Sequence, residues 1–332
     1  MKYNSKKTIL ITGGTGSFGK SFIKHILKKN EYQKIIIFSR DELKQHEMRQ
    51  DKNFSDLVHK NLRYFIGDVR DKERLVHALR EVDVVVHAAA LKQVPTGEYN
   101  PSEVIKTNII GAQNIIDVSL QQKVQKVIAL STDKAVSPIN LYGASKLCSD
   151  KLFISSNNIK GNRDISFSVV RYGNVMGSRG SVLHEFKKQK INGLLKITHK
   201  DMTRFNIFLK ESVEMVNWAL KNCIGGEILI PKIPSFKITD LAKAVAPNSK
   251  IKIIGIRDGE KIHEELLSKA DSQNSYDTQK YYLILDNNKK LITFYKNKFK
   301  VKKVPLGFSY TSDNNKDFLS VKKLKDIVDN FS

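Results

Sequence analysis

A glycine-rich turn directly after a short apolar segment constrains the fold of this chain more than any other feature of its 332 residues. Residues 8–12 (TILIT) predict a buried strand, and residues 13–19 (GGTGSFG) contain both G-x-G-x-x-G and G-x-x-G-x-x-G. Glycine lets the backbone approach a pyrophosphate, and a helix that begins near Ser17 directs free N–H groups at that anion. A glycine-rich turn without a ligand is the alternative. The motif predicts a dinucleotide site formed by Gly13, Thr15, Gly16, Ser17, Phe18 and Gly19.

Strand and helix patterns alternate through the first half of the chain. Further strands are predicted at residues 34–38, 62–66, 83–87, 126–130 and 165–171. Their apolar residues are continuous rather than alternating, which is typical of strands covered on both faces. Residues at helical spacing lie between them. This alternation predicts an α/β fold with a doubly wound parallel sheet of the Rossmann-like type.

The pattern changes after about Asn174, where turns, glycine and lysine become denser. We expect residues 1–173 to form the dinucleotide-binding domain, with return segments around residues 206–230. We expect residues 174–205 and 231–332 to form a smaller α/β domain that binds substrate and is interleaved with the sheet.

Composition limits the cellular setting. The net charge is +23, but no run of five like charges occurs, which favours a solvated surface over a nucleic-acid footprint. No segment approaches the roughly 18 apolar residues of a membrane span, and no secretory signal pattern is evident. Cys148 and Cys223 are too few for a disulfide framework or a closed zinc site. We expect a cytoplasmic protein that binds neither nucleic acid nor membrane, although a non-catalytic nucleotide- or nucleic-acid-binding protein stays an alternative.

The end of the second strand bears on the choice of cofactor. Dinucleotide sites specific for NAD usually place a carboxylate there, which accepts hydrogen bonds from the ribose. This chain has Ser39 and Arg40 instead, and Lys44 follows one helical turn later. A guanidinium can pair with a phosphate, so the sequence favours NADP, whereas the nearby Asp41 keeps NAD as the alternative. Asp68, after the third strand, either flanks the adenine or caps a turn.

A tyrosine and a lysine four residues apart follow the fifth strand. Thr132, Asp133 and Lys134 come at the carboxyl end of that strand, where open α/β sheets bind ligands. Tyr142 and Lys146 then share one face of a predicted helix. The ammonium of Lys146 can hold a ribose and lower the phenol pKa from its usual value of about 10, so that Tyr142 can take a hydroxyl proton. A core tyrosine and a solvated lysine are the alternative.

Motifs along nearly the whole chain, from Thr8 to about Leu324, carry a family resemblance. They are TGGTGSFG, FSRDELKQ, GDVRD, HAAALKQVP, EYNP, TNIIGAQN, STDKAVSPINLYGASK, RYGNVMGSRGSV, MTRF and IRDGEKIHEELL. Together they resemble the extended short-chain dehydrogenase/reductase superfamily and, within it, the inverting UDP-N-acetylglucosamine 4,6-dehydratases of pseudaminic acid biosynthesis. The pair Asp133-Lys134 is the most specific part, because related dehydratases that retain configuration commonly carry Asp-Glu there.

The resemblance implies a reaction on a UDP-sugar. Tyr142 takes the proton of the carbon 4 hydroxyl while hydride passes to a tightly bound NADP, which is regenerated in each turnover. Lys134 removes the proton from carbon 5, and Asp133 protonates the departing carbon 6 hydroxyl, with Thr132 or water as another route for that proton. Hydride return to carbon 6, with protonation of carbon 5 from the opposite face, inverts carbon 5 and gives a UDP-linked 6-deoxy-4-keto-L-arabino-hexos-4-ulose. A UDP-N-acetylhexosamine epimerase is the alternative, although epimerisation at carbon 4 needs no carbon 5 base.

The implied roles raise a protonation problem. Asp133 must carry a proton and Lys134 must lack one, but the ordinary pKa values favour the ion pair. Moving the proton from the lysine to the aspartate costs roughly 9 kcal/mol in water, and burial narrows that gap.

The resemblance also implies further contacts and a homo-oligomer. It adds Val69, Ala88 and Lys92 to the cofactor site. Asp258 stands where the family usually has proline, beside the arginine proposed for the diphosphate. His263, Glu264 and Glu265 do not have the spacing of a zinc motif, so no metal is expected. The implied substrate contacts are Lys92, Tyr142, Asn174, Val182, Thr198, Arg204, Arg257 and Glu260.

Overall fold

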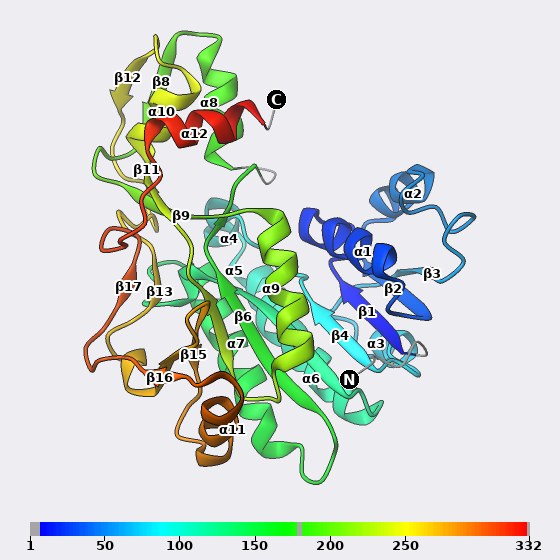
Figure 1. Cartoon of the computed structure of the whole chain (residues 1–332). Coiled ribbons are helices and arrows are strands. Elements are labelled where there is room, and N and C mark those ends of the chain that lie inside the picture. The colour runs from blue at the N-terminus through cyan, green and yellow to red at the C-terminus, as the bar shows by residue number, and fades with distance from the viewer. Residues whose placement is uncertain (1–6, 178–180, 331–332) are drawn as a thin grey trace.

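A ten-stranded sheet forms the centre of the computed structural model, which describes residues 7–177 and 181–330 (Figure 1). Seven neighbouring strands are parallel, in the order β3-β2-β1-β4-β5-β6-β10. This topology confirms the predicted doubly wound parallel sheet. The seven strands are β1 (Thr8–Thr12), β2 (Lys34–Ser39), β3 (Leu62–Ile66), β4 (Val84–His87), β5 (Lys126–Thr132), β6 (Ser166–Tyr172) and β10 (Ile228–Pro231).

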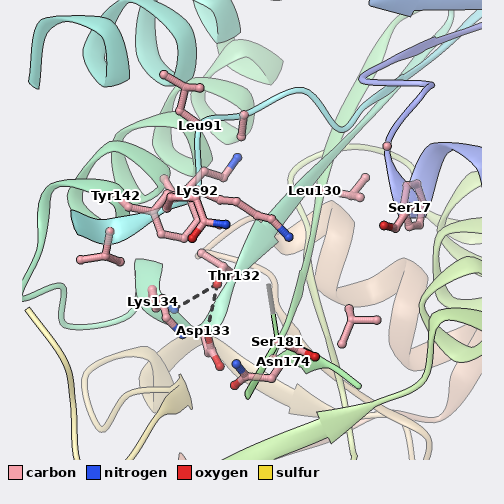
Figure 2. A pocket seen from close by; sticks show the side chains of 18 of the residues that line it. Ser17, Leu91, Lys92, Leu130, Thr132, Asp133, Lys134, Tyr142, Asn174 and Ser181 are labelled. Atoms are coloured by element: carbon pink, nitrogen blue, oxygen red, sulfur yellow. Dashed lines mark hydrogen bonds and ion pairs between the residues drawn. The ribbon is translucent and has the colours of Figure 1, made fainter. Parts of the chain in front are cut away.

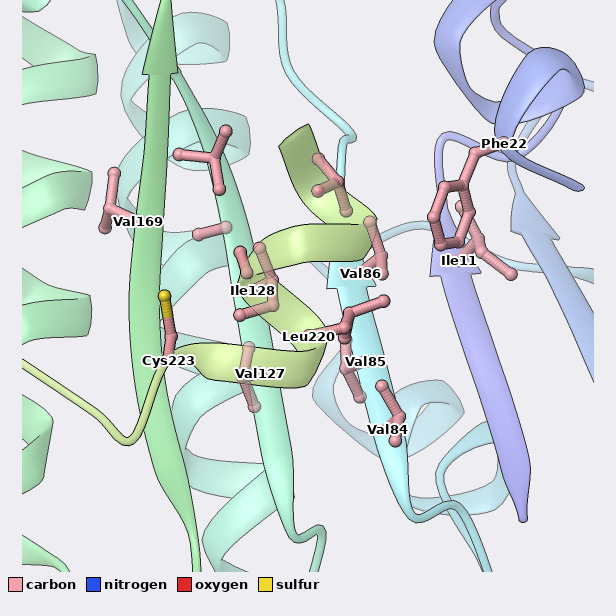
Figure 3. Packing of buried hydrophobic residues seen from close by; sticks show 14 of the residues in the cluster. Ile11, Phe22, Val84, Val85, Val86, Val127, Ile128, Val169, Leu220 and Cys223 are labelled. Atoms are coloured by element: carbon pink, nitrogen blue, oxygen red, sulfur yellow. The ribbon is translucent and has the colours of Figure 1, made fainter. Parts of the chain in front are cut away.

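Helices cover both faces of the sheet (Figure 1). One face carries α1 (Ser17–Lys29) and α9 (Leu209–Asn222), which contact each other. Figure 3 shows Leu220 and Cys223, at the end of α9, above the strands that bear Val85 and Val127. The apolar runs of the strands are continuous because both faces are buried in this way. The other face carries α3 (Lys72–Ala78), α6 (Gly111–Gln121) and α7 (Leu141–Ile159).

Shorter helical elements connect the strands. The helix α2 (Glu42–Gln50) follows β2, and α4 (Val94–Tyr99), α5 (Pro101–Val104) and a π-helix (Ile105–Ile110) lead from β4 to α6. In the part of the chain that the structure describes, no helix combines the length and the apolar character needed to cross a membrane.

A second apolar core lies in a separate lobe, at the top of Figure 1, which we call the cap lobe. Leu195, Leu241 and Leu324 are fully buried in this core, although they come from distant parts of the chain. A short sheet of β7 (Asn174–Val175), β9 (Thr203–Ile207) and β11 (Ser235–Lys237) lies between the two cores. The cap lobe consists of α8 (Val182–Lys190), β8 (Leu194–Ile197), α10 (Ile238–Val245), β12 (Lys250–Ile253) and α12 (Val321–Asp329).

The remaining segments return to the large sheet. Strand β13 (Glu265–Leu267) pairs with β17 (Tyr310–Thr311). The sequence-based division places residues 231–332 in the substrate-binding domain, but residues 275–303 supply three antiparallel edge strands of the large sheet. These strands can join the large sheet because β10 is the last of its parallel strands and has a free edge, with which β15 pairs in antiparallel orientation. These elements are β14 (Ser275–Asp277), β15 (Tyr281–Ile284), α11 (Lys289–Phe299) and β16 (Lys302–Lys303).

Candidate active site

Every residue that the sequence analysis places in a site lines one cavity of about 1180 Å³. It extends from the glycine-rich turn, across the carboxyl ends of β1, β2, β4 and β5, to the cap lobe. Figure 2 shows Lys92, Tyr142, Thr132, Asp133 and Lys134 grouped in one part of this cavity. The parallel strands explain this grouping, since their carboxyl ends meet at one edge of the sheet.

The glycine-rich turn has the shape needed to hold a pyrophosphate. Gly13 has φ +65°, and a Cβ atom there would lie 3.0 Å from the carbonyl oxygen of Ala88. A Cβ atom on Gly16 would lie 3.1 Å from the carbonyl oxygen of Gly13. Gly16 caps α1 without a side-chain hydrogen bond, so the first N–H groups of the helix are left for a ligand. These features fit a dinucleotide.

The carboxylate nearest the end of β2 is engaged within its own helix. Asp41 caps α2 by accepting a hydrogen bond of 2.9 Å from the backbone N–H of Lys44, and it also pairs with the ammonium of that residue. These hydrogen bonds hold the pKa of Asp41 below its usual value. Arg40 lies beside it with a half-exposed side chain, and its Nη1 atom is 3.7 Å from the Oδ2 atom of Asp68. A cation, rather than a free carboxylate, is therefore available at this position.

Asp68 closes a turn at the edge of the cavity. Its carboxylate accepts hydrogen bonds from the backbone N–H of Arg70 at 3.0 Å and from the guanidinium of that residue at 2.7 Å. It thus closes a turn, and it also lines the cavity beside Val69.

Tyr142 and Lys146 lie one turn apart on α7, which begins at Leu141. The side chain of Asn140 caps this helix by accepting a hydrogen bond of 2.8 Å from the N–H of Gly143. Burial lowers the pKa of Lys146. Burial also raises the pKa of Tyr142 to about 12, against the opposite effects of Lys134 and Thr132. The expectation that Lys146 lowers the tyrosine pKa is therefore not met in the protein alone, because the loss of hydration dominates.

Asp133 and Lys134 form a buried charged group with two other side chains. The Nζ atom of Lys134 lies 3.2 Å from Oδ1 of Asp133 and 2.8 Å from Oε1 of Glu264. The Nε atom of Arg204 lies 3.7 Å from the same Glu264 oxygen. Thr132 donates a hydrogen bond of 2.9 Å to Oδ1 of Asp133. A proton can therefore move among neighbouring groups here without crossing bulk water.

Glu264 is a site residue that sequence reasoning missed. It belongs to the His263-Glu264-Glu265 stretch, which carries no recognisable metal spacing. In the structure its side chain is only 2% exposed and lines the cavity, because the chain returns past Lys134 just before β13. Among the described residues, no group of three or more His, Cys, Asp or Glu side chains is placed to hold a metal ion.

Several buried polar atoms around the cavity lack a hydrogen-bond partner within the described protein. Buried polar atoms are normally paired, so such atoms indicate where a ligand supplies the partner. Asn206 is the most pronounced case, since both of its amide atoms are unpaired and its side chain is buried. Asn206 lies opposite Asn174 in the pairing of β7 with β9. No sequence motif reveals that these two residues are neighbours. The unpaired atoms are Thr107 Oγ1, Asp133 Oδ2, Ser181 Oγ, Asn206 Oδ1 and Nδ2, and Glu264 Oε2.

The cap side of the cavity contains the remaining predicted substrate residues. Val182 begins α8, and Thr198 is buried just after β8. Arg204 donates hydrogen bonds to the carbonyl oxygens of Thr203 and Ile262, and its Nη2 atom is 3.6 Å from Glu260. Arg257 and Asp258 are exposed at the cavity wall. Arg204 thus has carboxylate neighbours on two sides, whereas Arg257 is accessible to an anionic ligand.

Comparison with known proteins gives a family match and several close sequence relatives. The polysaccharide biosynthesis protein family matches residues 9–286. The chain is 55% identical over 332 residues to a UDP-N-acetylglucosamine 4,6-dehydratase (inverting) of Campylobacter jejuni, with 97% of each chain covered. It is 43% identical over 332 residues to a UDP-glucose 4-epimerase of Rickettsia typhi, with 97% of this chain and 95% of the relative covered.

A solved structure has the same overall fold. The structure of Pen from Bacillus thuringiensis superimposes with a TM-score of 0.89 at 36% sequence identity. The superposition covers 99% of both chains. The cap lobe is therefore included in this similarity, as well as the sheet.

Proposed function

The chain belongs to the polysaccharide biosynthesis protein family of the extended short-chain dehydrogenase/reductases, and from this premise we propose that it is an inverting UDP-N-acetylglucosamine 4,6-dehydratase. Its product is then the UDP-linked 6-deoxy-4-keto-L-arabino-hexos-4-ulose, as expected of the pseudaminic acid pathway. The observation that carries this proposal is the contact between the buried carboxylate of Asp133 and the partly exposed amine of Lys134, beside Tyr142 in one cavity. Removing water from carbons 5 and 6 needs an acid and a base there, and this pair supplies both.

Each reactive side chain has a distinct part in this reaction. The phenolate form of Tyr142 takes the proton of the carbon 4 hydroxyl, and Lys146 holds the nicotinamide ribose. A nicotinamide held there would supply the hydride transfer, from carbon 4 and back to carbon 6. Lys134 takes the proton of carbon 5, whose acidity rises once carbon 4 is a ketone. Asp133 gives a proton to the leaving hydroxyl of carbon 6. Thr132 holds the carboxyl group of Asp133 by the hydrogen bond described above.

We propose NADP rather than NAD as the cofactor. Support comes from Arg40, which is half exposed at the end of β2, and from Asp41, whose carboxylate is occupied by Lys44. A 2′-phosphate can pair with Arg40 and Lys44, and it can accept a hydrogen bond from Ser39. The start of α1 would then hold the pyrophosphate, and Val69, Ala88 and Lys92 would border the rest of the dinucleotide.

The UDP-sugar occupies the cap side of the cavity in this proposal. Arg257 is placed to pair with the diphosphate, and Glu260 to accept hydrogen bonds from the uridine ribose. Lys92, Asn174 and Asn206 face the sugar, together with Val182, Thr198 and Arg204. The unpaired amide of Asn206 supports this placement, since a sugar offers both donors and acceptors. We further propose a homo-oligomer that acts in the cytoplasm.

The decisive experiment follows the mass of the product. Purified protein is incubated with UDP-N-acetylglucosamine in heavy water, and the product is analysed by mass spectrometry and NMR. A dehydratase yields a product that has lost one water and carries deuterium at carbon 5. A product that keeps the water and gains no label at carbon 5 contradicts the proposal. It would support a UDP-N-acetylhexosamine epimerase, a second candidate that the 43% identity to a UDP-glucose 4-epimerase favours.

A further inference from the structure

The nearest carboxylate to the amine of Lys134 belongs to a residue 130 positions later in the chain. The Oε1 atom of Glu264 is 2.8 Å from Nζ of Lys134, whereas Oδ1 of Asp133 is 3.2 Å away. Both carboxylates are almost fully buried, and 23% of the Lys134 side chain is exposed, toward the cavity. Glu264 therefore contacts Lys134, the base of the proposed reaction, and still leaves the Lys134 amine accessible to substrate in the cavity.

The two carboxylates differ in their surroundings. Burial raises the pKa of Asp133, and the negative charge of Glu264 adds to this effect against the opposing charge of Lys134. Burial acts on Glu264 as well, but the positive charges of Lys134 and Arg204 outweigh it and lower the pKa of Glu264. Asp133 is thus the carboxyl group suited to carry a proton, and Glu264 is the one suited to be the anion beside Lys134.

On the premise of the proposed dehydratase, we propose that Glu264 is a positioning residue that holds the Lys134 amine and accepts its surplus proton before the amine attacks carbon 5. Asp133 cannot accept this proton if it already carries the one destined for the carbon 6 hydroxyl. Glu264 can, because it is in direct contact with Nζ and its other oxygen has no partner in the described protein.

The proton count of this step balances. One proton moves from the ammonium of Lys134 to the carboxylate of Glu264, which leaves a neutral amine and a neutral carboxyl group. The amine then takes the proton of carbon 5. The electron pair of that C–H bond forms the double bond between carbons 5 and 6 while the C–O bond at carbon 6 breaks. The hydroxide leaves as water with the proton of Asp133.

Other charged groups around the pair keep it ionised at rest. Arg204 lies on the other side of Glu264 and favours its anionic form. Arg204 is also near Glu260. Lys261 adds positive charge and donates a hydrogen bond of 2.6 Å to the carbonyl oxygen of Val136. In the unliganded protein burial raises the pKa of Tyr142 to about 12, so its phenol adds no negative charge beside the pair. The proton therefore stays on Lys134 in the resting protein. It moves to Glu264 only when the ketone at carbon 4 has made the proton of carbon 5 acidic enough for the amine to take.

This arrangement predicts an unusual pH dependence. Over the neutral range the Lys134–Glu264 pair keeps one mobile proton, so the neutral amine forms without releasing a proton to solvent, and the rate at which carbon 5 loses its proton is independent of pH. In Glu264→Gln the amide cannot accept a proton. Lys134 must then lose its proton to solvent, and the exchange rate should rise about tenfold per pH unit below the pKa of the amine.

The test measures deuterium incorporation at carbon 5 by NMR, from about pH 6 to about pH 9, in the unmutated protein, Glu264→Gln and Glu264→Asp. We expect Glu264→Gln to be about 100-fold slower at neutral pH and to become pH-dependent. Glu264→Asp keeps a carboxylate and should stay pH-independent at a lower rate. Glu265→Gln is the matched control, since Glu265 contacts Ser137 and lies outside the cavity lining.

The outcomes separate this inference from the proposed function. If the unmutated protein does not dehydrate the sugar, the proposed function fails. If it does, but Glu264→Gln exchanges carbon 5 within about threefold of the normal rate and without pH dependence, the role of Glu264 is refuted. Absorbance of the reduced nicotinamide reports oxidation at carbon 4 and shows whether each variant is folded. If Glu264→Gln lacks that signal, Glu264→Asp decides, and pH-dependent exchange in that variant overturns the proposal.

Discussion

The Nζ atom of Lys134 lies 3.2 Å from the Oδ1 atom of Asp133, so the base and the acid of the proposed elimination are in contact before substrate binds. Both residues come from the short helical turn that follows β5. Adjacent residues of this turn can therefore act on adjacent carbons of the sugar. The contact also means that a change at either residue alters the charge of the other.

Replacing Lys134 should separate the two halves of the reaction. In Lys134→Ala, Tyr142 still takes the carbon 4 proton, so reduced nicotinamide should accumulate in a single turnover. Elimination should stall, because carbon 5 has lost its base, and dehydrated product should fall by about 100-fold or more. Rapid mixing with absorbance detection, followed by mass spectrometry of the quenched sample, measures both. A variant that dehydrates at the normal rate would show that another group is the base.

Replacing Tyr142 should block the reaction at its start. Tyr142→Phe removes only the titrating oxygen, so the affinity for the nucleotide should stay nearly unchanged while oxidation at carbon 4 slows by about 100- to 10,000-fold. Calorimetric titration with UDP and single-turnover absorbance measure the two effects. Oxidation at the normal rate in this variant would exclude Tyr142 as the base.

The charge at the end of β2 should set the choice of cofactor. The unmutated protein should bind NADP more tightly than NAD, and Arg40→Asp should reverse that preference. The loss of one charge-assisted hydrogen bond predicts a change of about 10- to 100-fold in the ratio of the two dissociation constants. Arg49→Asp is the matched control, because Arg49 is on α2 but pairs with Asp56 outside the cavity lining. Equal affinity of the unmutated protein for both cofactors would refute this interpretation.

Asn206 should lower the stability of the unliganded protein and improve binding of the UDP-sugar. Its amide is buried without a partner in the described protein, which is costly in the unliganded state. Asn206→Leu has a similar volume, so we expect the free energy of unfolding to rise by about 1 kcal/mol while the KM for the UDP-sugar increases. Denaturant unfolding without ligand and steady-state kinetics measure these changes. A less stable variant with an unchanged KM would indicate a purely structural role.

His87 should make the fold sensitive to mild acid. Thr12 accepts hydrogen bonds from the N–H groups of Ala88 and Ala89, so its hydroxyl hydrogen points to Nδ1 of His87 at 2.9 Å, which must be unprotonated. Burial lowers the pKa of His87 to about 3. Below the unfolded value of about 6.5, the unfolded chain takes up a proton that the folded chain does not.

The free energy of unfolding should therefore fall by up to about 1.4 kcal/mol per pH unit as the pH drops from about 6.5. Denaturant unfolding at several pH values measures this slope. In His87→Leu the contribution is missing, so the slope between pH 6.5 and pH 4 should be smaller by that amount. Equal slopes in the two proteins would show that His87 does not contribute to the pH dependence of the free energy of unfolding, for example because it is protonated in the folded state.

The parts of the fold that depend on local pattern could be predicted from the sequence. The parallel strands carry continuous apolar runs, and the glycine-rich turn and the Tyr142–Lys146 spacing are local motifs. Glu264 and Asn206 could not be predicted, because strand pairings between distant segments bring them to the cavity. The return of residues 275–303 to the large sheet has the same cause, since short edge strands carry little pattern of their own.

The cap lobe combines segments that leave the ribosome at very different times. Leu195 and Leu241 are synthesised well before Leu324 and Val328, yet all four share one apolar core. Long loops must close before these contacts form, which slows their assembly relative to the local strand–helix units of the sheet. A nascent chain should therefore have the start of its nucleotide-binding edge long before the roof of the cavity is complete. On the proposed function, the cofactor side of the cavity is therefore synthesised before the segments that complete the lobe over its sugar side.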